Sequence, residues 1–220
     1  MAKNIYNNET FLSGRIGKLV YRTVRGKQVV SSYSKPRDPQ TRDQQLVRSR
    51  YALLGRIASF CKYVTRVGFH SEAQQTRSHA LARFMKANWP NISGSTPADL
   101  QVNWDDLVVA KGSNRRITLD SDHIDQTSVP GTISVAVQER GIVSGNYNAK
   151  DKCYLVAVCP EVEDACISDP VVRDEATELA VTPPGWWSGH KVYLYCFTTA
   201  PDNSEASESM AVGKIDFVIE

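Results

Sequence analysis

The sequence predicts an α+β protein in which a basic β-hairpin arm, a helical hairpin and a β-sandwich follow one another along the chain. Three observations lead to this fold class. Apolar residues recur every three or four positions between residues 41 and 89, which is the period of an amphipathic helix. From residue 92 onward they form short runs separated by Gly, Pro, Asn and Asp, as strands do. The charge also changes sign near Pro90, so we expect three segments, 1–37, 38–90 and 91–220.

Residues 11–34 are expected to form an extended basic arm that ends in a hairpin. Along Leu19–Val24 the residues Leu19, Tyr21 and Thr23 alternate with Val20, Arg22 and Val24, as on the two faces of a strand. Arg25-Gly26-Lys27 then supplies a turn before Gln28–Tyr33. Two strands alone are marginally stable in water, so the hairpin needs a partner. That partner is either the second domain of the same chain or the sheet edge of another chain.

A long amphipathic helix follows, from Thr41 to about Val67, and a second one runs from Ser71 toward Trp89. Opposite the apolar side of the first helix lies a stripe of four basic residues, Arg48, Arg56, Lys62 and Arg66. This stripe is either a solvated face or a surface for a nucleic-acid backbone or an acidic neighbour. Arg50 falls within the apolar side and must reach its edge or meet a carboxylate.

The last 125 or so residues contain about seven strand-like runs. They are residues 100–109, 116–119, 132–138, 152–158, 178–182, 191–199 and 209–219. Seven short strands with turn residues between them favour a sandwich of the immunoglobulin or fibronectin type III kind.

The net charge of +2 conceals two oppositely charged parts. Residues 1–90 hold 17 Lys or Arg and 4 Asp or Glu, a net charge of +13, whereas the remaining 130 residues hold 9 and 20, a net charge of −11. Three interpretations stay open: the basic part of one subunit docks on the acidic part of a neighbour, the two parts neutralise each other within one molecule, or the basic part contacts nucleic acid.

No catalytic or metal-binding constellation emerges from the sequence. Gly14 to Lys18 superficially resembles a phosphate-binding loop, but its spacing is too short and Leu19 replaces the hydroxyl residue that follows the lysine. The four histidines are scattered, and the five cysteines contain no C-x-x-C pair. We therefore expect no metal, no cofactor and no enzymatic activity.

Two further features bear on binding and location. Trp186 and Trp187 lie side by side in a glycine-flanked loop, where they either pack into the sandwich or form a stacking platform for a sugar or a partner. Met1–Thr10 is polar, so we expect no classical secretory signal. Apolar runs such as Tyr154–Val158 fall far short of the roughly 20 residues that span a bilayer, so we expect no membrane contact.

Several residues of the arm, linker and first helix resemble an uncharacterised family, a domain of unknown function found in Bacteroidota and their phages. The residues that carry this resemblance are Gly14, Gly17-Lys18, Val20, Arg25-Gly26, Val29-Val30, Lys35-Pro36, Thr41, Gln44-Gln45 and Arg48, and the closing pattern Val192–Tyr195 with Ser207 and Ser209 is similar too. The resemblance spans most of the chain and implies no activity. By association with phage genomes it implies a virion or prophage structural role, with a virion or cytoplasmic location.

Together these observations predict a non-enzymatic structural protein that assembles with itself or docks with other virion proteins, for example in a phage tail, connector or ring. The predicted contact residues of the arm are Arg15, Lys18, Arg22, Arg25 and Lys27. Two alternatives remain: a nucleic-acid-binding module that uses the arm and the helix stripe, and a carbohydrate- or surface-binding sandwich that uses the tryptophan pair.

Overall fold

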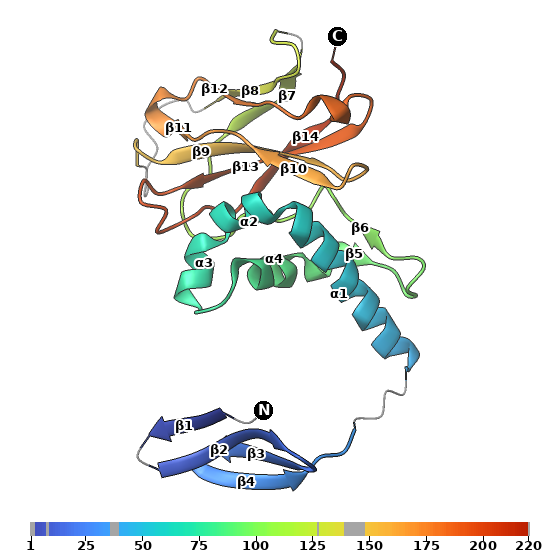
Figure 1. Cartoon of the computed structure of the whole chain (residues 1–220). Helices are drawn as coiled ribbons and strands as arrows, with labels where there is room; N and C mark the ends of the chain where they lie inside the picture. The colour runs from blue at the N-terminus through green and yellow to red at the C-terminus, as the bar shows by residue number, and fades with distance from the viewer. Residues whose placement is uncertain (1–2, 8, 36–39, 127, 139–147, 220) are drawn as a thin grey trace. The chain divides into compact units, whose positions relative to one another are not determined.

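The computed structural model describes residues 3–7, 9–35, 40–126, 128–138 and 148–219. The chain divides into two compact units, residues 1–41 (unit 1) and residues 42–220 (unit 2). The expected boundary between residues 37 and 38 lies outside the described residues. The α+β fold class is confirmed, and all sheets in the described residues are antiparallel (Figure 1).

Unit 1 is a four-stranded antiparallel sheet in which each strand pairs with the next one along the chain (Figure 1). Its strands are β1 (Lys3–Asn7), β2 (Glu9–Ile16), β3 (Leu19–Val24) and β4 (Lys27–Ser32). The predicted hairpin is therefore present as β3 and β4. Two further strands that the sequence does not predict, β1 and β2, precede the hairpin in the same sheet.

The helical part of unit 2 begins with α1 (Arg42–Phe60) and α2 (Lys62–Gly68), which together replace the single long helix expected. Hydrogen bonds from the Cys61 amide to the Ile57 carbonyl and from the Thr65 amide to the Cys61 carbonyl, 2.9 and 2.8 Å long, continue the helical pattern through the interruption.

The second predicted helix is split into α3 (His70–Gln75) and α4 (Ala80–Asn88). Arg77 adopts a left-handed backbone conformation with φ of 49°. The Ser78 amide then bonds to the Ala73 carbonyl over 2.9 Å and the Arg77 amide to the Gln74 carbonyl over 3.2 Å. This pattern is a Schellman motif, which ends a helix, and here it does so without glycine.

Unit 2 contains a five-stranded sheet and a three-stranded sheet. The five-stranded sheet holds β9 (Lys152–Cys159), β10 (Asp164–Ile167), β11 (Val171–Val172), β13 (Lys191–Thr199) and β14 (Met210–Asp216). The three-stranded sheet holds β7 (Leu119–Asp125), β8 (Ile133–Val137) and β12 (Glu178–Val181). Short strands β5 (Ile92–Ser93) and β6 (Gln101–Val102) pair separately, and single-turn 3₁₀ helices occupy Trp89–Asn91, Arg173–Glu175 and Gly185–Trp187.

The five-stranded sheet is the middle layer of unit 2, between the three-stranded sheet and the helices (Figure 1). Alternate residues of β9 and β13, such as Leu155 and Leu194, pack with Ile133 of the smaller sheet. Their neighbours, such as Val156 and Tyr195, belong instead to the cluster formed with the helices. Because both faces of the middle sheet are covered, β9 is an almost uninterrupted apolar run.

The strand expected over residues 100–109 is mostly wrong, because only Gln101–Val102 are extended as a strand. The reason is a side chain that acts as a strand partner. The side-chain nitrogen Nδ2 of Asn88 donates to the Val108 carbonyl, and the backbone amide of Val108 donates to Oδ1 of Asn88, both over 2.8 Å. This pairing fixes the segment against α4 rather than against a sheet.

Candidate functional site

The sheet of unit 1 is the strongest candidate for a functional surface because its two faces differ in chemistry. Gly14 pairs with Tyr21 and Tyr21 with Val30, so these residues share a face, while Arg22 and Val29 share the other one. We define the uncharged face as Leu12, Gly14, Ile16, Leu19, Tyr21, Thr23, Gln28, Val30 and Ser32. We define the basic face as Ser13, Arg15, Val20, Arg22, Val24, Lys27, Val29 and Ser31.

Two tight turns set this register. Arg25 and Gly26 both have positive φ, 50° and 77°, as a type I′ hairpin turn requires. Gly17, with φ of 59°, occupies the first position of the other two-residue turn, and no such angle occurs at Lys18, which matches type II′. The resemblance of Gly14–Lys18 to a phosphate-binding loop is therefore superficial, because this segment joins two strands.

The structure brings three of the five predicted arm residues, Arg15, Arg22 and Lys27, onto one face, and Lys18 and Arg25 into the turns at opposite ends of β3. All five are exposed. None of them forms an ion pair with a carboxylate that the structure describes.

Arg15 makes two described contacts within the sheet. Its guanidinium carbon lies 3.7 Å from the centre of the Tyr33 ring, and its Nε donates to the Gly17 carbonyl over 2.8 Å. The ring contact is a cation–π interaction, which holds the charge on the basic face without neutralising it.

The sheet has no core of its own among the residues whose side chains are described. Between residues 12 and 35 no described side chain is buried. Apolar residues are exposed on both faces: Ile16, Leu19 and Val30 on the uncharged one, and Val24 and Val29 on the basic one. A stable antiparallel sheet normally covers one face, whereas within residues 12–35 no described side chain of unit 1 is buried on either face.

The four basic residues of the helix stripe, Arg48, Arg56, Lys62 and Arg66, are all exposed on α1 and α2. Arg56 forms an ion pair with Glu163, so internal neutralisation accounts for at least this residue. Arg50 bonds through Nη2 to the Gly94 carbonyl over 2.8 Å, so it meets a backbone oxygen rather than a carboxylate.

The two alternatives for the tryptophan pair divide between its members: Trp187 packs into the core, and only Trp186 is exposed. Trp187 is fully buried between the sheets, and its indole nitrogen donates to Asp164 Oδ2 over 3.2 Å. Trp186 is 68% exposed. The 3₁₀ turn Gly185–Trp187 separates the two neighbours, so a ligand can meet only one indole here.

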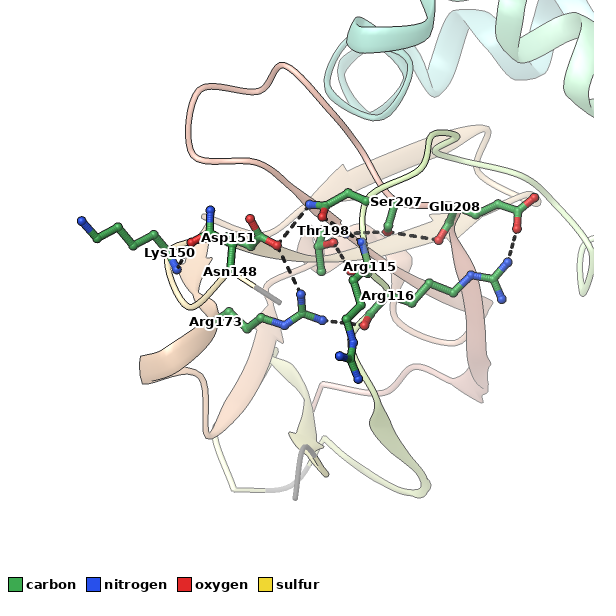
Figure 2. A network of polar contacts seen from close by, with 10 residues as sticks. Arg115, Arg116, Asn148, Lys150, Asp151, Arg173, Thr198, Ser207 and Glu208 are labelled. Atoms are coloured by element: carbon green, nitrogen blue, oxygen red, sulfur yellow. Dashed lines mark hydrogen bonds and ion pairs between the residues drawn. The ribbon is translucent and has the colours of Figure 1, made fainter. Parts of the chain in front are cut away.

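A buried polar network joins the strand ends and loops at one edge of the two sheets (Figure 2). Arg173 Nη1 lies 3.3 Å from Asp151 Oδ2, and neither side chain is more than 2% exposed. Asn114 also donates to Asp151 over 3.2 Å, and Arg173 Nη2 donates to the Arg116 carbonyl. Because the charges are mutually neutralised and inaccessible, the network fixes loops rather than forming a site.

The described residues provide little for catalysis. Among them no three His, Cys, Asp or Glu side chains are grouped so that they could hold a metal ion. Burial raises the pKa of both Cys166 and Cys196 to about 12, which keeps these thiols protonated and unreactive. None of the helices in the described ranges is long and apolar enough to cross a membrane.

Two hollows in unit 2 are less informative than the sheet. An apolar groove of about 470 Å³ on the helical layer is lined by Tyr51, Met85 and Trp89 among others. A polar one of about 310 Å³ is lined by residues of both charges, including Glu72, Lys111 and Glu208. The polar hollow also contains Ser71 and Ser113, but no described hydrogen bond joins either hydroxyl to one of its carboxylates, as a nucleophile activated by a base would require.

Comparisons with family models, curated proteins and solved structures found no match to this chain.

Proposed function

We propose that this protein is a non-enzymatic structural component that assembles with copies of itself, or with other proteins of a larger particle, through its N-terminal sheet. The resemblance of the arm, linker and helix to a Bacteroidota and phage family supports a virion setting, such as a tail, connector or ring. Acidic side chains on unit 2 of a neighbouring copy are the docking surface for the basic face.

The observation that carries this proposal is the sheet of unit 1, where no described side chain of residues 12–35 is buried and the five predicted arm cations have no described carboxylate partner. Residues 1–41 contain eight Lys or Arg and two Asp or Glu, whereas residues 42–220 contain 18 and 22, so the units have net charges of +6 and −4. Opposite net charges steer two such surfaces together and resist the approach of like surfaces. A head-to-tail contact of this kind generates rings or filaments when repeated.

Size-exclusion chromatography with light scattering on the full chain tests the proposal. At about 50 mM salt we expect assemblies larger than a dimer, and at about 500 mM salt, where the Debye length falls below about 5 Å, we expect these to dissociate. The double variant Arg22→Glu/Lys27→Glu removes two cations from the basic face and should prevent the larger assemblies at low salt.

A matched control is Lys150→Glu/Lys191→Glu, which makes the same change in net charge at exposed positions of unit 2. It should leave the assemblies intact. A chain that stays monomeric at both salt concentrations, or assembly that is lost equally in both double variants, would refute the proposal.

Binding of nucleic acid by the basic face is a second candidate function, because five exposed cations there and in the adjacent turns have no described carboxylate partner. Fluorescence anisotropy with single- and double-stranded DNA at about 50 mM salt measures it. The logarithm of the binding constant should then fall linearly with the logarithm of salt, and Arg22→Glu should lower the slope by about one or more. Absence of binding at low salt excludes this function.

We also propose that the two packed sheets of unit 2 are an immunoglobulin- or fibronectin III-like sandwich. Two antiparallel sheets with a shared core support this relation. The helical layer on the outer face of the larger sheet is an addition to that architecture.

A further inference from the structure

We propose that the uncharged face of the N-terminal sheet is a homodimer interface, on which the same face of a second copy of this chain packs as one sheet against another. This inference rests on the proposed assembly function and adds its partner and geometry.

The occupant is a second copy because this face suits an identical surface. Every residue of the uncharged face lacks a charge, and Leu12, Ile16, Leu19, Tyr21 and Val30 supply its apolar area. A twofold interface places a patch against itself, so it must contain no excess of one charge. The basic face fails this condition, since Arg15, Arg22 and Lys27 would meet their own copies.

Sheet-on-sheet packing also satisfies the backbone geometry. Two antiparallel sheets pack about 10 Å apart with strands roughly 30° from parallel, and their side chains interdigitate. On the uncharged face Leu19 of the inner strand β3 lies between Ile16 and Ser32, and Tyr21 lies between Gly14 and Val30. Each of these two large side chains therefore has one small and one branched apolar cross-strand neighbour.

The size of the sheet limits the strength of the dimer. Four strands about 4.8 Å apart and about six residues long cover roughly 19 by 20 Å, or about 400 Å² per copy. A standard stable interface buries about 800 Å² per partner, so this interface is at the small end of the range and the dimer should be weak and concentration-dependent. Its basic faces point outward, where they remain available to acidic surfaces of further copies.

Val29 and Val30 form a matched pair for testing the interface. They are neighbours on β4, 46% and 49% exposed, and they lie on opposite faces. Val30→Asp introduces a carboxylate near its own copy in the dimer, whereas Val29→Asp makes the same chemical change on the basic face. Sedimentation equilibrium of the full chain at about 500 mM salt, which screens the basic–acidic contacts, isolates the sheet interface.

At high salt we expect the parent chain and Val29→Asp to dimerise with similar constants, and Val30→Asp to dimerise at least about 100-fold more weakly. A parent chain that forms large assemblies at low salt but only monomers at high salt would overturn this inference and leave the proposed function standing. A dimer that is insensitive to Val30→Asp, or more sensitive to Val29→Asp, also overturns it.

Cross-linking gives a second readout that does not depend on an acidic substitution being tolerated. Tyr21→Cys places a thiol at the centre of the uncharged face, and Arg22→Cys places one on the basic face of the same strand. A short bismaleimide should join two Tyr21→Cys chains at high salt and leave Arg22→Cys chains unjoined. The five native cysteines lie in unit 2, four of them buried, and the parent chain gives their background. Equal cross-linking of the two variants contradicts the interface.

Discussion

Replacing Arg173 by methionine tests whether the buried polar network stabilises unit 2. The substitution keeps a long apolar side chain but removes the charge that faces Asp151 at 3.3 Å and the hydrogen bond to the Arg116 carbonyl. Asp151 would then be a buried carboxylate, with the Asn114 amide still donating to it. Breaking a fully buried ion pair in this way costs about 3–5 kcal/mol, because desolvation of the remaining charge is no longer compensated.

That cost is a large part of the roughly 5–15 kcal/mol that a domain of this kind has in total. Urea denaturation followed by far-UV circular dichroism, with intrinsic tryptophan fluorescence as a second probe, should show a lower midpoint at an unchanged slope. The matched control is Glu208→Gln, which breaks an ion pair with Arg116 whose side chains are 50% and 51% exposed. An exposed pair contributes less than about 1 kcal/mol.

The double variant Arg173→Met/Asp151→Leu separates the charge from the packing. Removing both partners leaves no uncompensated charge, so most of the lost stability should return. The reasoning is refuted if Arg173→Met costs no more than Glu208→Gln, or if the double variant is less stable than Arg173→Met alone.

Three further predictions concern unit 2. Trp187→Ala should cost about 3–5 kcal/mol and Trp186→Ala less than about 0.5 kcal/mol in urea denaturation, because only the first indole is buried; equal costs would contradict this. Gly68→Ala should cost about 1–3 kcal/mol or more in the same assay, because a β-carbon there would lie 2.3 Å from the Val109 carbonyl oxygen, and a neutral result would show that this contact relaxes freely. Cys166 should react slowly with iodoacetamide at about pH 8 in the folded chain, where its pKa is raised to about 12, and quickly in denaturant. Rapid labelling of the folded chain would contradict this burial. The unfolded chain loses the Cys166 proton near the ordinary pKa of 9.0, so above that pH it binds fewer protons than the folded chain. The free energy of unfolding should therefore fall as the pH rises from 9 toward 12.

The elements that could be predicted from the sequence are those whose signal is local. Alternation along Leu19–Val24, followed by Arg25-Gly26, is enough to indicate a hairpin, since glycine readily adopts the positive φ that the turn needs. The apolar run Lys191–Thr199 is found as a strand with the expected bounds. Each of these depends on neighbours within a few residues.

The elements that the sequence did not predict depend on distant partners. Residues 100–109 look extended and apolar, but the side chain of Asn88 takes the position of a neighbouring strand. The four-residue strand β10 becomes a strand only by pairing with β9. Trp186 and Trp187 have almost the same sequence context, and only the 3₁₀ turn separates the exposed indole from the buried one.

The candidate site was predicted in its residues but not in its organisation. Arg15, Arg22 and Lys27 are contact residues only by prediction from the sequence, and the structure places them on one face. The contrast between the two faces follows from the register of β2, β3 and β4, which the turn geometry sets. Alternation in the sequence contains this signal once both turns are recognised as two-residue turns.

The change of charge at Pro90 invites an expression boundary between the helices and the sheets, yet the middle sheet of unit 2 argues against one. A fragment without the helices would expose Tyr154, Val156 and Phe197 of β9 and β13 to water as one continuous apolar surface. A fragment that starts after Pro90 should therefore aggregate or bind other proteins non-specifically. A fragment that ends at Pro90 should lack the sheet surface against which its helices pack. The helices and sheets of unit 2 are thus best produced, purified and melted together, as a single cooperative body.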